Sequence, residues 1–120
     1  MSRYRGLTLR VLAASAPAMG PGKAELIERI KRTGSISAAA RDMGMSYRRA
    51  WQLVESLNAT FREPVVTTAI GGNRGGGARV TPFGERLVAG FRAMETKASA
   101  AIAGDLRRYE GHLRKSGKRA

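Results

Sequence analysis

The sequence contains no cysteine and a single histidine, His112. The missing cysteines exclude disulfide bonds, thiolate metal sites and cysteine nucleophiles. Acidic residues are scarce too: nine Asp and Glu stand against 22 Lys and Arg, which gives a net charge of +13. With so few residues suited to proton transfer or metal binding, we expect no cofactor and no metal site. The composition argues against most classes of enzyme.

Long apolar runs are also absent. No stretch approaches the roughly 18–20 apolar residues that a membrane span requires. Arg10 interrupts the apolar residues near the N-terminus, which disfavours a secretory signal. We therefore expect a cytoplasmic protein without a membrane partner.

The excess of positive charge is the most prominent feature that is present. A charge of +13 exceeds the roughly 2–8 units that keep a small domain soluble. Such a charge suits a polyanionic partner, either nucleic acid or an anionic membrane surface. The 120 residues suffice for one small domain with a single modest core.

The N-terminal quarter is predicted to form a strand, a loop and a helix. Apolar and polar residues alternate over 6–12, which is typical of a half-buried strand. Residues 13–22 contain two prolines and two glycines and are predicted to form a loop. A helix over about 22–33 follows, and Gly34 is expected to end it in the left-handed conformation.

Two short helices separated by Gly44 are the strongest pattern in the sequence. They are predicted over residues 38–43 and 47–60, with Ser37 and Ser46 as N-caps. Glycine at the sharp turn allows two helices to cross at the steep angle of a helix-turn-helix.

One side of the second of these helices is apolar and the other is polar. The core side is formed by Ala50, Leu53, Val54 and Leu57. Arg48 and Gln52 lie opposite, and they suit bidentate contacts to guanine and adenine. The residues that we predict to contact DNA from this recognition helix are Ser46, Tyr47, Arg48, Arg49 and Gln52.

Several of these positions have alternative interpretations. Arg49 also fits a solvated surface charge, and Ser46 fits a cap with no other role. Trp51 is predicted to be a structural aromatic at the edge of the core. Tyr47 fits the same role or a contact from its hydroxyl group to a phosphate.

A glycine-rich hairpin follows the helices. Strands are predicted over 65–70 and 78–80, joined by a turn with five glycines in residues 71–77. The loop lacks the Lys-Ser or Lys-Thr of a nucleotide-binding P-loop. The hairpin is instead typical of a wing that contacts the DNA backbone or minor groove. The wing residues predicted to contact DNA are Asn73, Arg74 and Arg79.

One long amphipathic helix is predicted over 82–113, with Thr81 as its N-cap and Pro82 at its first position. Its apolar stripe exceeds what so small a core can cover, so we expect it to form a homodimer. The predicted dimer residues are Leu87, Phe91, Met94, Ile102, Leu106 and Tyr109.

These residues also carry a family resemblance. The segments Gly34-Ser35-Ile36-Ser37-Ala38-Ala39-Ala40-Arg41 and Met45-Ser46-Tyr47-Arg48, with the glycine-rich wing, resemble the DNA-binding domain of ModE-type molybdenum-responsive regulators. That domain is similar to the LysR type of winged helix-turn-helix. The resemblance implies a homodimer with paired DNA-reading helices.

Two departures limit what the resemblance implies. Full-length members of the family carry C-terminal domains that bind molybdate, and this sequence reaches Ala120 without them. We therefore expect no molybdate binding by this chain. Arg74 occupies a wing position where the family pattern has glycine, which predicts an added phosphate contact.

The sequence thus predicts a mainly α fold with a small β-wing. Residues 1–81 form a winged helix-turn-helix (strand 6–12, helix-turn-helix 37–60, wing 65–81), residues 82–113 a dimerisation helix, and residues 114–120 a basic disordered tail.

The favoured function is that of a bacterial-type transcription regulator, a homodimer that binds double-stranded DNA in a sequence-specific manner. The alternative is a winged-helix module that binds a protein and contacts DNA weakly; its docking face should be apolar. An enzyme is disfavoured, because the acidic pairs Glu25 with Glu28 and Glu85 with Glu95 fit solvated helix charges.

Overall fold

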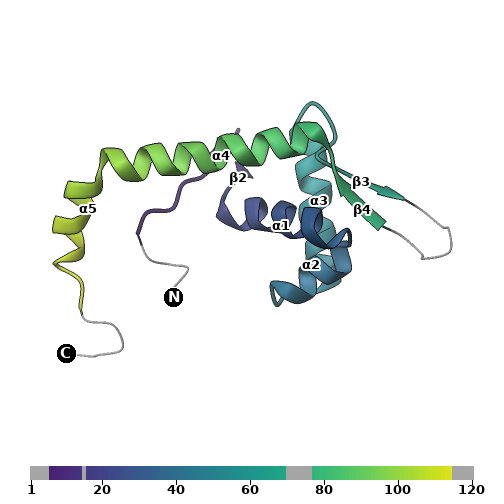
Figure 1. The fold of residues 1–120 in the computed structure, drawn as a ribbon, viewed down its shortest axis with the longest axis horizontal. Helices are drawn as coiled ribbons and strands as arrows, with labels where there is room; N and C mark the ends of the chain where they lie inside the picture. The colour runs from purple at the N-terminus through teal and green to yellow at the C-terminus, as the bar shows by residue number, and fades with distance from the viewer. Residues whose placement is uncertain (1–5, 15, 70–76, 115–120) are drawn as a thin grey trace.

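The computed structural model describes residues 6–14, 16–69 and 77–114 (Figure 1). The elements in chain order are β1 (Val11–Ala13), β2 (Ala16–Met19), α1 (Pro21–Thr33), α2 (Ile36–Asp42), α3 (Tyr47–Thr60), β3 (Val66–Ala69), β4 (Gly77–Val80), α4 (Pro82–Ala101) and α5 (Ala103–Glu110). The predicted mainly α fold with a small β-wing is confirmed. Asn73, Arg74 and the tail from residue 115 onward lie outside the described residues.

The core is built where α1, α2 and α3 meet. The apolar face predicted for the first helix is buried, and Leu26 and Ile30 have no exposed surface. Ala39 of α2 and Ala50 of α3 are fully buried as well. Because alanine side chains are short, these two helices can approach each other closely at their crossing. Leu57 completes the core from α3.

Glycines form the turns after α1 and α2. Gly34 and Gly44 have φ angles of 72° and 69°, the left-handed conformation that glycine adopts most readily. Ser46 caps α3 as predicted, since its Oγ accepts the N–H of Arg49 at 3.0 Å. The prediction that Ser37 caps α2 is wrong. Ser35 holds that position, because buried Ile36 is already the first residue of the helix.

The N-terminal segment differs from the predicted single strand and loop. β1 and β2 form an antiparallel hairpin, so part of the predicted loop is a strand. Pro17 pairs with Leu12 in this two-stranded ribbon, where a missing N–H is tolerated at a free edge. Leu12 is 67% exposed, so the strand is not half-buried in the single chain as predicted.

The predicted wing is present as β3 and β4. They pair antiparallel from Val66 opposite Val80 to Ala69 opposite Gly77. The buried face of this hairpin closes one end of the core through Val66 and Ala78.

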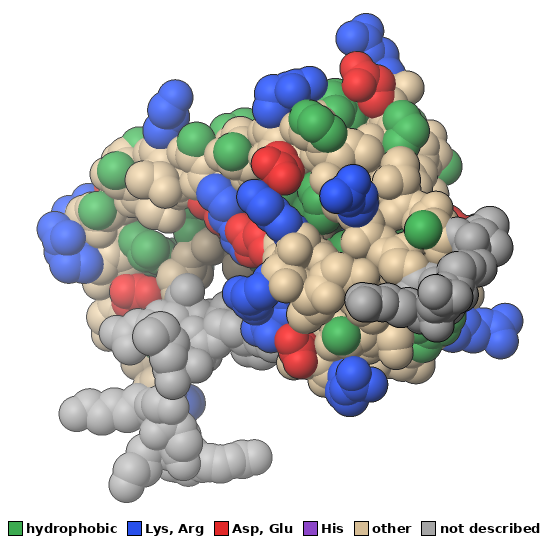
Figure 2. Space-filling model, turned by 45° about the vertical axis from the view of Figure 1, so that its right-hand side comes forward, with side chains coloured by type: hydrophobic (Ala, Val, Ile, Leu, Met, Phe, Trp, Pro, Cys, Tyr) green, Lys and Arg blue, Asp and Glu red, His purple; other side chains and the backbone are tan. Residues whose placement is uncertain are grey.

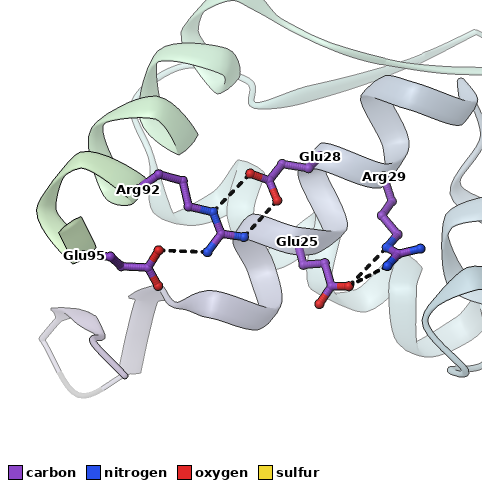
Figure 3. A network of polar contacts seen from close by, with 5 residues as sticks. All are labelled: Glu25, Glu28, Arg29, Arg92 and Glu95. Carbon is purple, nitrogen blue, oxygen red and sulfur yellow. Dashed lines mark hydrogen bonds and ion pairs between the residues drawn. The ribbon is translucent and has the colours of Figure 1, made fainter. Parts of the chain in front are cut away.

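α4 packs against α1 and completes the core (Figure 1). Thr81 caps it as predicted, with Oγ1 accepting the N–H of Gly84 at 2.9 Å. An ion-pair network joins the two helices (Figure 3): the Arg92 guanidinium donates to Glu28 at 2.8 and 3.1 Å and to Glu95 at 2.9 Å. Glu28 is therefore a structural ion-pair partner rather than the solvated charge that its pattern predicted.

The prediction of one continuous helix to residue 113 is wrong. α4 ends at Ala101, and Ile102 leaves the helical conformation with φ −113° and ψ 16°. α5 then runs in a different direction (Figure 1). No residue of α5 is buried, and Gly104 lies in its first turn, so neither packing nor helix propensity keeps the helix continuous here.

The second half of α4 (residues 92–101) and the whole of α5 (residues 103–110) extend away from the core (Figure 1). We call this segment the arm. The molecule measures 55 × 31 × 26 Å and has a radius of gyration of 17.0 Å. A compact chain of this length would have a radius of roughly 13–14 Å. The arm therefore carries its apolar residues beyond the reach of the chain's own core.

Candidate nucleic-acid interface

α3 presents a polar face to solvent because its apolar face is fixed in the core. Ala50, Val54 and Leu57 are at most 2% exposed. Arg48 and Gln52, on the opposite side of the helix, are exposed, as the helical periodicity predicted. The two side chains lie one turn apart and can reach successive positions on a groove floor.

The N-terminal turn of α3 adds two further polar groups. Arg49 is exposed on one flank of the helix. The Ser46 side chain accepts the N–H of Arg49, which leaves its hydroxyl hydrogen available to donate elsewhere. The capping role of Ser46 is thus established, and it is compatible with a contact to phosphate.

Tyr47 and Trp51 lie on the other flank as a stacked pair. Their ring centroids are 6.5 Å apart and their planes differ by 15°. Trp51 is half-buried against the core, as predicted for a structural aromatic. Tyr47 is 56% exposed, so the stack positions a phenol at the solvent surface beside the reading face.

The sequence reasoning overlooked an acidic residue on the same face. Glu55 is exposed and follows Arg48 by about two helical turns, which places it on the same side of α3. The positive part of the face is therefore limited to the first two turns. A carboxylate at the end of a basic stretch is the signal that would have marked this limit.

The wing is attached to α3 and α1 by hydrogen bonds that the sequence did not predict. Asn58 accepts the N–H of Val65 at 2.7 Å, and its Nδ2 donates to the carbonyl of Val66 at 2.9 Å. The Ala78 N–H donates to the Gly34 carbonyl at 3.0 Å. These bonds fix the base of the wing relative to the helix-turn-helix, and exposed Arg79 extends from the returning strand.

The electrostatic environment of the interface is positive. Figure 2 shows Lys and Arg spread over one face of the molecule, with fewer Asp and Glu among them. Partial burial, and then the nearby charge of Arg49, lower the pKa of Lys23 below its ordinary value. In the described part of the chain Lys23 forms no ion pair, so no carboxylate offsets its positive charge beside the recognition helix.

Within 6–14, 16–69 and 77–114, no group of three or more His, Asp or Glu side chains is arranged to hold a metal ion. None of the helices there is long and apolar enough to cross a membrane.

The sequence of this region is similar to that of a known helix-turn-helix family. Residues 22–85, more than half of the chain, match the bacterial regulatory helix-turn-helix proteins of the lysR family. The chain belongs to that family. The match spans α1 to α3, the wing and the start of α4, so it covers the surface described above.

Individual relatives make the type of helix-turn-helix more specific. The chain is 46% identical to the molybdenum-pterin-binding protein MopB of Rhodobacter capsulatus over 93 residues, 78% of this chain and 34% of that protein. It is 38% identical to the molybdenum transport protein ModE of Azotobacter vinelandii over 71% of this chain and 32% of that protein. The DNA-binding transcriptional dual regulator ModE of Escherichia coli is 40% identical over 57% of this chain and 26% of its own length. The predicted resemblance to the ModE type is confirmed, and the chain spans between a quarter and about a third of these relatives.

Proposed function

We propose that the chain binds double-stranded DNA in a sequence-specific manner as part of a transcription regulator. The observation that carries this proposal is the exposed row of Arg48, Arg49 and Gln52 on a helix whose opposite side is locked into the core. Arginine and glutamine recognise guanine and adenine through paired hydrogen bonds in the major groove. A protein-docking face at this position would instead have an apolar core depleted of charged residues.

The roles within the interface follow from position. Arg48 and Gln52 contact base edges, while Ser46, Tyr47 and Arg49 contact phosphates or bases at the start of α3. Arg79 contacts the backbone from the wing, together with Asn73 and Arg74, for which the sequence is the only support.

The relatives' names refer to molybdenum, and we infer a molybdenum-related regulatory role. The absence of molybdate binding by this chain stays a prediction, to be measured by titration calorimetry.

We further propose a homodimer formed through the arm. Met94 is 46% exposed and Tyr109 is 72% exposed. Ile102 and Leu106 are half-buried, and no residue of α5 is fully buried in the single chain. Leu87 lies at the edge of the core and can contribute to both surfaces. Phe91 has to be removed from the predicted set, because it is 1% exposed and belongs to the chain's own core.

Arg48→Ala tests the sequence-reading role. On a selected binding site we expect a loss of about 1–3 kcal/mol, with a much smaller loss on a scrambled duplex, because a base contact carries sequence information. Arg79→Ala should weaken both duplexes similarly and lower the salt slope by about one unit, because a phosphate contact releases a counterion whatever the sequence. Fluorescence anisotropy on both duplexes across a salt series measures these effects. An equal loss for Arg48→Ala on both duplexes would contradict the assignment of α3 as the reading helix.

A further inference from the structure

A hollow beside α3 gathers three cations from distant parts of the chain. It has a volume of about 290 Å³ and lies between the first turns of α3 and the start of α1. Arg10 lines it from the segment before β1, Lys23 from α1 and Arg49 from α3. Among the described residues, no carboxylate lines this hollow.

Contacts at Gly20 and Pro17 position two of the three cations, Arg10 and Lys23. The Cγ atom of Arg10 lies 3.5 Å from the position that a Cβ atom on Gly20 would occupy, so the Arg10 stem packs closely over that glycine. The Lys23 Nζ donates to the carbonyl of Pro17 at 3.0 Å, which links α1 to the N-terminal hairpin. Neither contact neutralises a charge, and in the described part of the chain none of the three cations forms an ion pair.

Three uncompensated cations in one hollow favour an anion. Burial is the larger cause of the lowered pKa of Lys23 and the charge of Arg49 is the second, so the two positive charges also act on each other. The first turn of α1 adds partial positive charge, because Pro21 begins the helix and no side chain caps it. An anionic group placed here gains several charge-assisted hydrogen bonds at once.

The position of the hollow indicates which anion it takes. In Figure 1 the wing strands extend to one side of α3, and β2, which borders the hollow, lies on the other. A helix in the major groove, roughly 12 Å wide, has a sugar–phosphate backbone on both sides. If the wing contacts one of these backbones, as proposed above, the hollow lies on the side of α3 where the other would run.

We propose that the hollow formed by Arg10, Lys23 and Arg49 binds a backbone phosphate of the DNA next to the groove that α3 reads. This inference rests on the proposed function and adds Arg10 and Lys23 to the interface. The volume of the hollow, about 290 Å³, leaves room for a phosphodiester group with part of its hydration. The contact is independent of sequence and fixes the register of α3 in the groove.

The double variant Arg10→Gln/Lys23→Gln tests the proposal, with Arg86→Gln/Lys97→Gln as its control. Both remove one arginine and one lysine charge, and the control residues are exposed on α4 away from the hollow. On a short random-sequence duplex, we expect the first variant to lower the slope of log K against log salt by about one unit, because about 0.9 unit is lost per phosphate contact. The control should leave that slope unchanged. Equal slopes for the two variants would overturn the proposal.

A second measurement uses the unmodified chain and does not depend on how a variant folds. Lysine acetylation followed by mass spectrometry should show that the duplex protects Lys23 several-fold while Lys97 reacts as before. Unchanged reactivity of Lys23 in the bound state would also overturn the proposal. A wild-type chain that binds no duplex would refute the proposed function itself, whereas binding with an unprotected Lys23 would refute only the phosphate contact.

Discussion

At the scale of single residues, Arg92 is the main polar link between α1 and α4. Its two hydrogen bonds to Glu28 have a parallel, bidentate geometry, which fixes both side chains better than a single contact would (Figure 3). The hydrogen bond from Arg92 holds the pKa of Glu28 below its usual value of 4.5. Both side chains remain more than one-third exposed, so solvent screening keeps the contribution of the pair to roughly 1 kcal/mol or less.

Glu28→Gln is therefore expected to lower the free energy of unfolding by about 0.5–1 kcal/mol at neutral pH. A carboxyl group with a depressed folded-state pKa stabilises the fold above its unfolded pKa, and this contribution is lost as pH falls through the folded value. The difference between wild type and variant should thus shrink progressively below about pH 4.5. Urea denaturation at a series of pH values measures it.

The matched control is Glu63→Gln, which removes a carboxylate from an exposed residue that forms no ion pair within the described ranges. It should leave the free energy of unfolding almost unchanged at every pH. A Glu28→Gln variant whose destabilisation persisted undiminished at acidic pH would show that packing, not the charge on Glu28, connects the two helices.

At the scale of elements, Gly84 controls how closely the start of α4 approaches Val65, the residue that precedes β3. A Cβ atom at Gly84 would lie 2.5 Å from the carbonyl oxygen of Val65, which is backbone and cannot rotate away. We expect Gly84→Ala to destabilise the fold by about 1–3 kcal/mol because the helix or the strand must shift. Chemical denaturation of the variant gives the magnitude.

Gly90 on the same helix provides the control. It is exposed, and a Cβ atom there would meet nothing within 4 Å. Gly90→Ala should stabilise the protein by about 0.5–1 kcal/mol through helix propensity alone. If both substitutions changed stability in the same direction, the close contact at Gly84 would not be what fixes α4 there.

The elements differ in how well their sequence predicted them. α1 and α3 were predictable because each has a strong 3.6-residue apolar period and a glycine or serine at its boundary. The N-cap of α2 was misplaced by two residues because Ser35 and Ser37 both suit a cap, and only the burial of Ile36 distinguishes them. The break at Ile102 was missed because the apolar period continues through it.

In the candidate site, too, the sequence predicted some features and not others. Arg48 and Gln52 were predictable because their exposure depends only on the periodicity of one helix. The Asn58 anchor links the end of α3 to the start of the wing, seven and eight residues further on, whereas the hollow formed by Arg10, Lys23 and Arg49 joins segments much farther apart in the sequence. No local pattern encodes such contacts, since they arise only when the tertiary fold is complete.

At the scale of the whole molecule, the arm determines the oligomeric state that we expect. α5 is eight residues long and has no buried residue, and isolated helices of that length are marginal in water. A partner surface that covers Met94, Leu106 and Tyr109 would stabilise it. We therefore expect sedimentation velocity to show a dimer at micromolar concentration in the absence of DNA, and a stable monomer there would contradict this proposal.

Met94→Glu tests where the dimer forms. Met94 is 46% exposed on the arm, so a carboxylate there should leave the core intact but insert an unpaired charge into the proposed interface. We expect the variant to sediment as a monomer and to bind duplex DNA more weakly, because two linked reading helices gain affinity from one another. Thr96→Glu adds the same charge on the other side of α4, where Thr96 is exposed, and should remain dimeric. A Met94→Glu variant that remained dimeric would show that the interface does not lie on this part of α4. The surface to test next would then be the exposed apolar residues Val11 and Leu12 of the N-terminal hairpin.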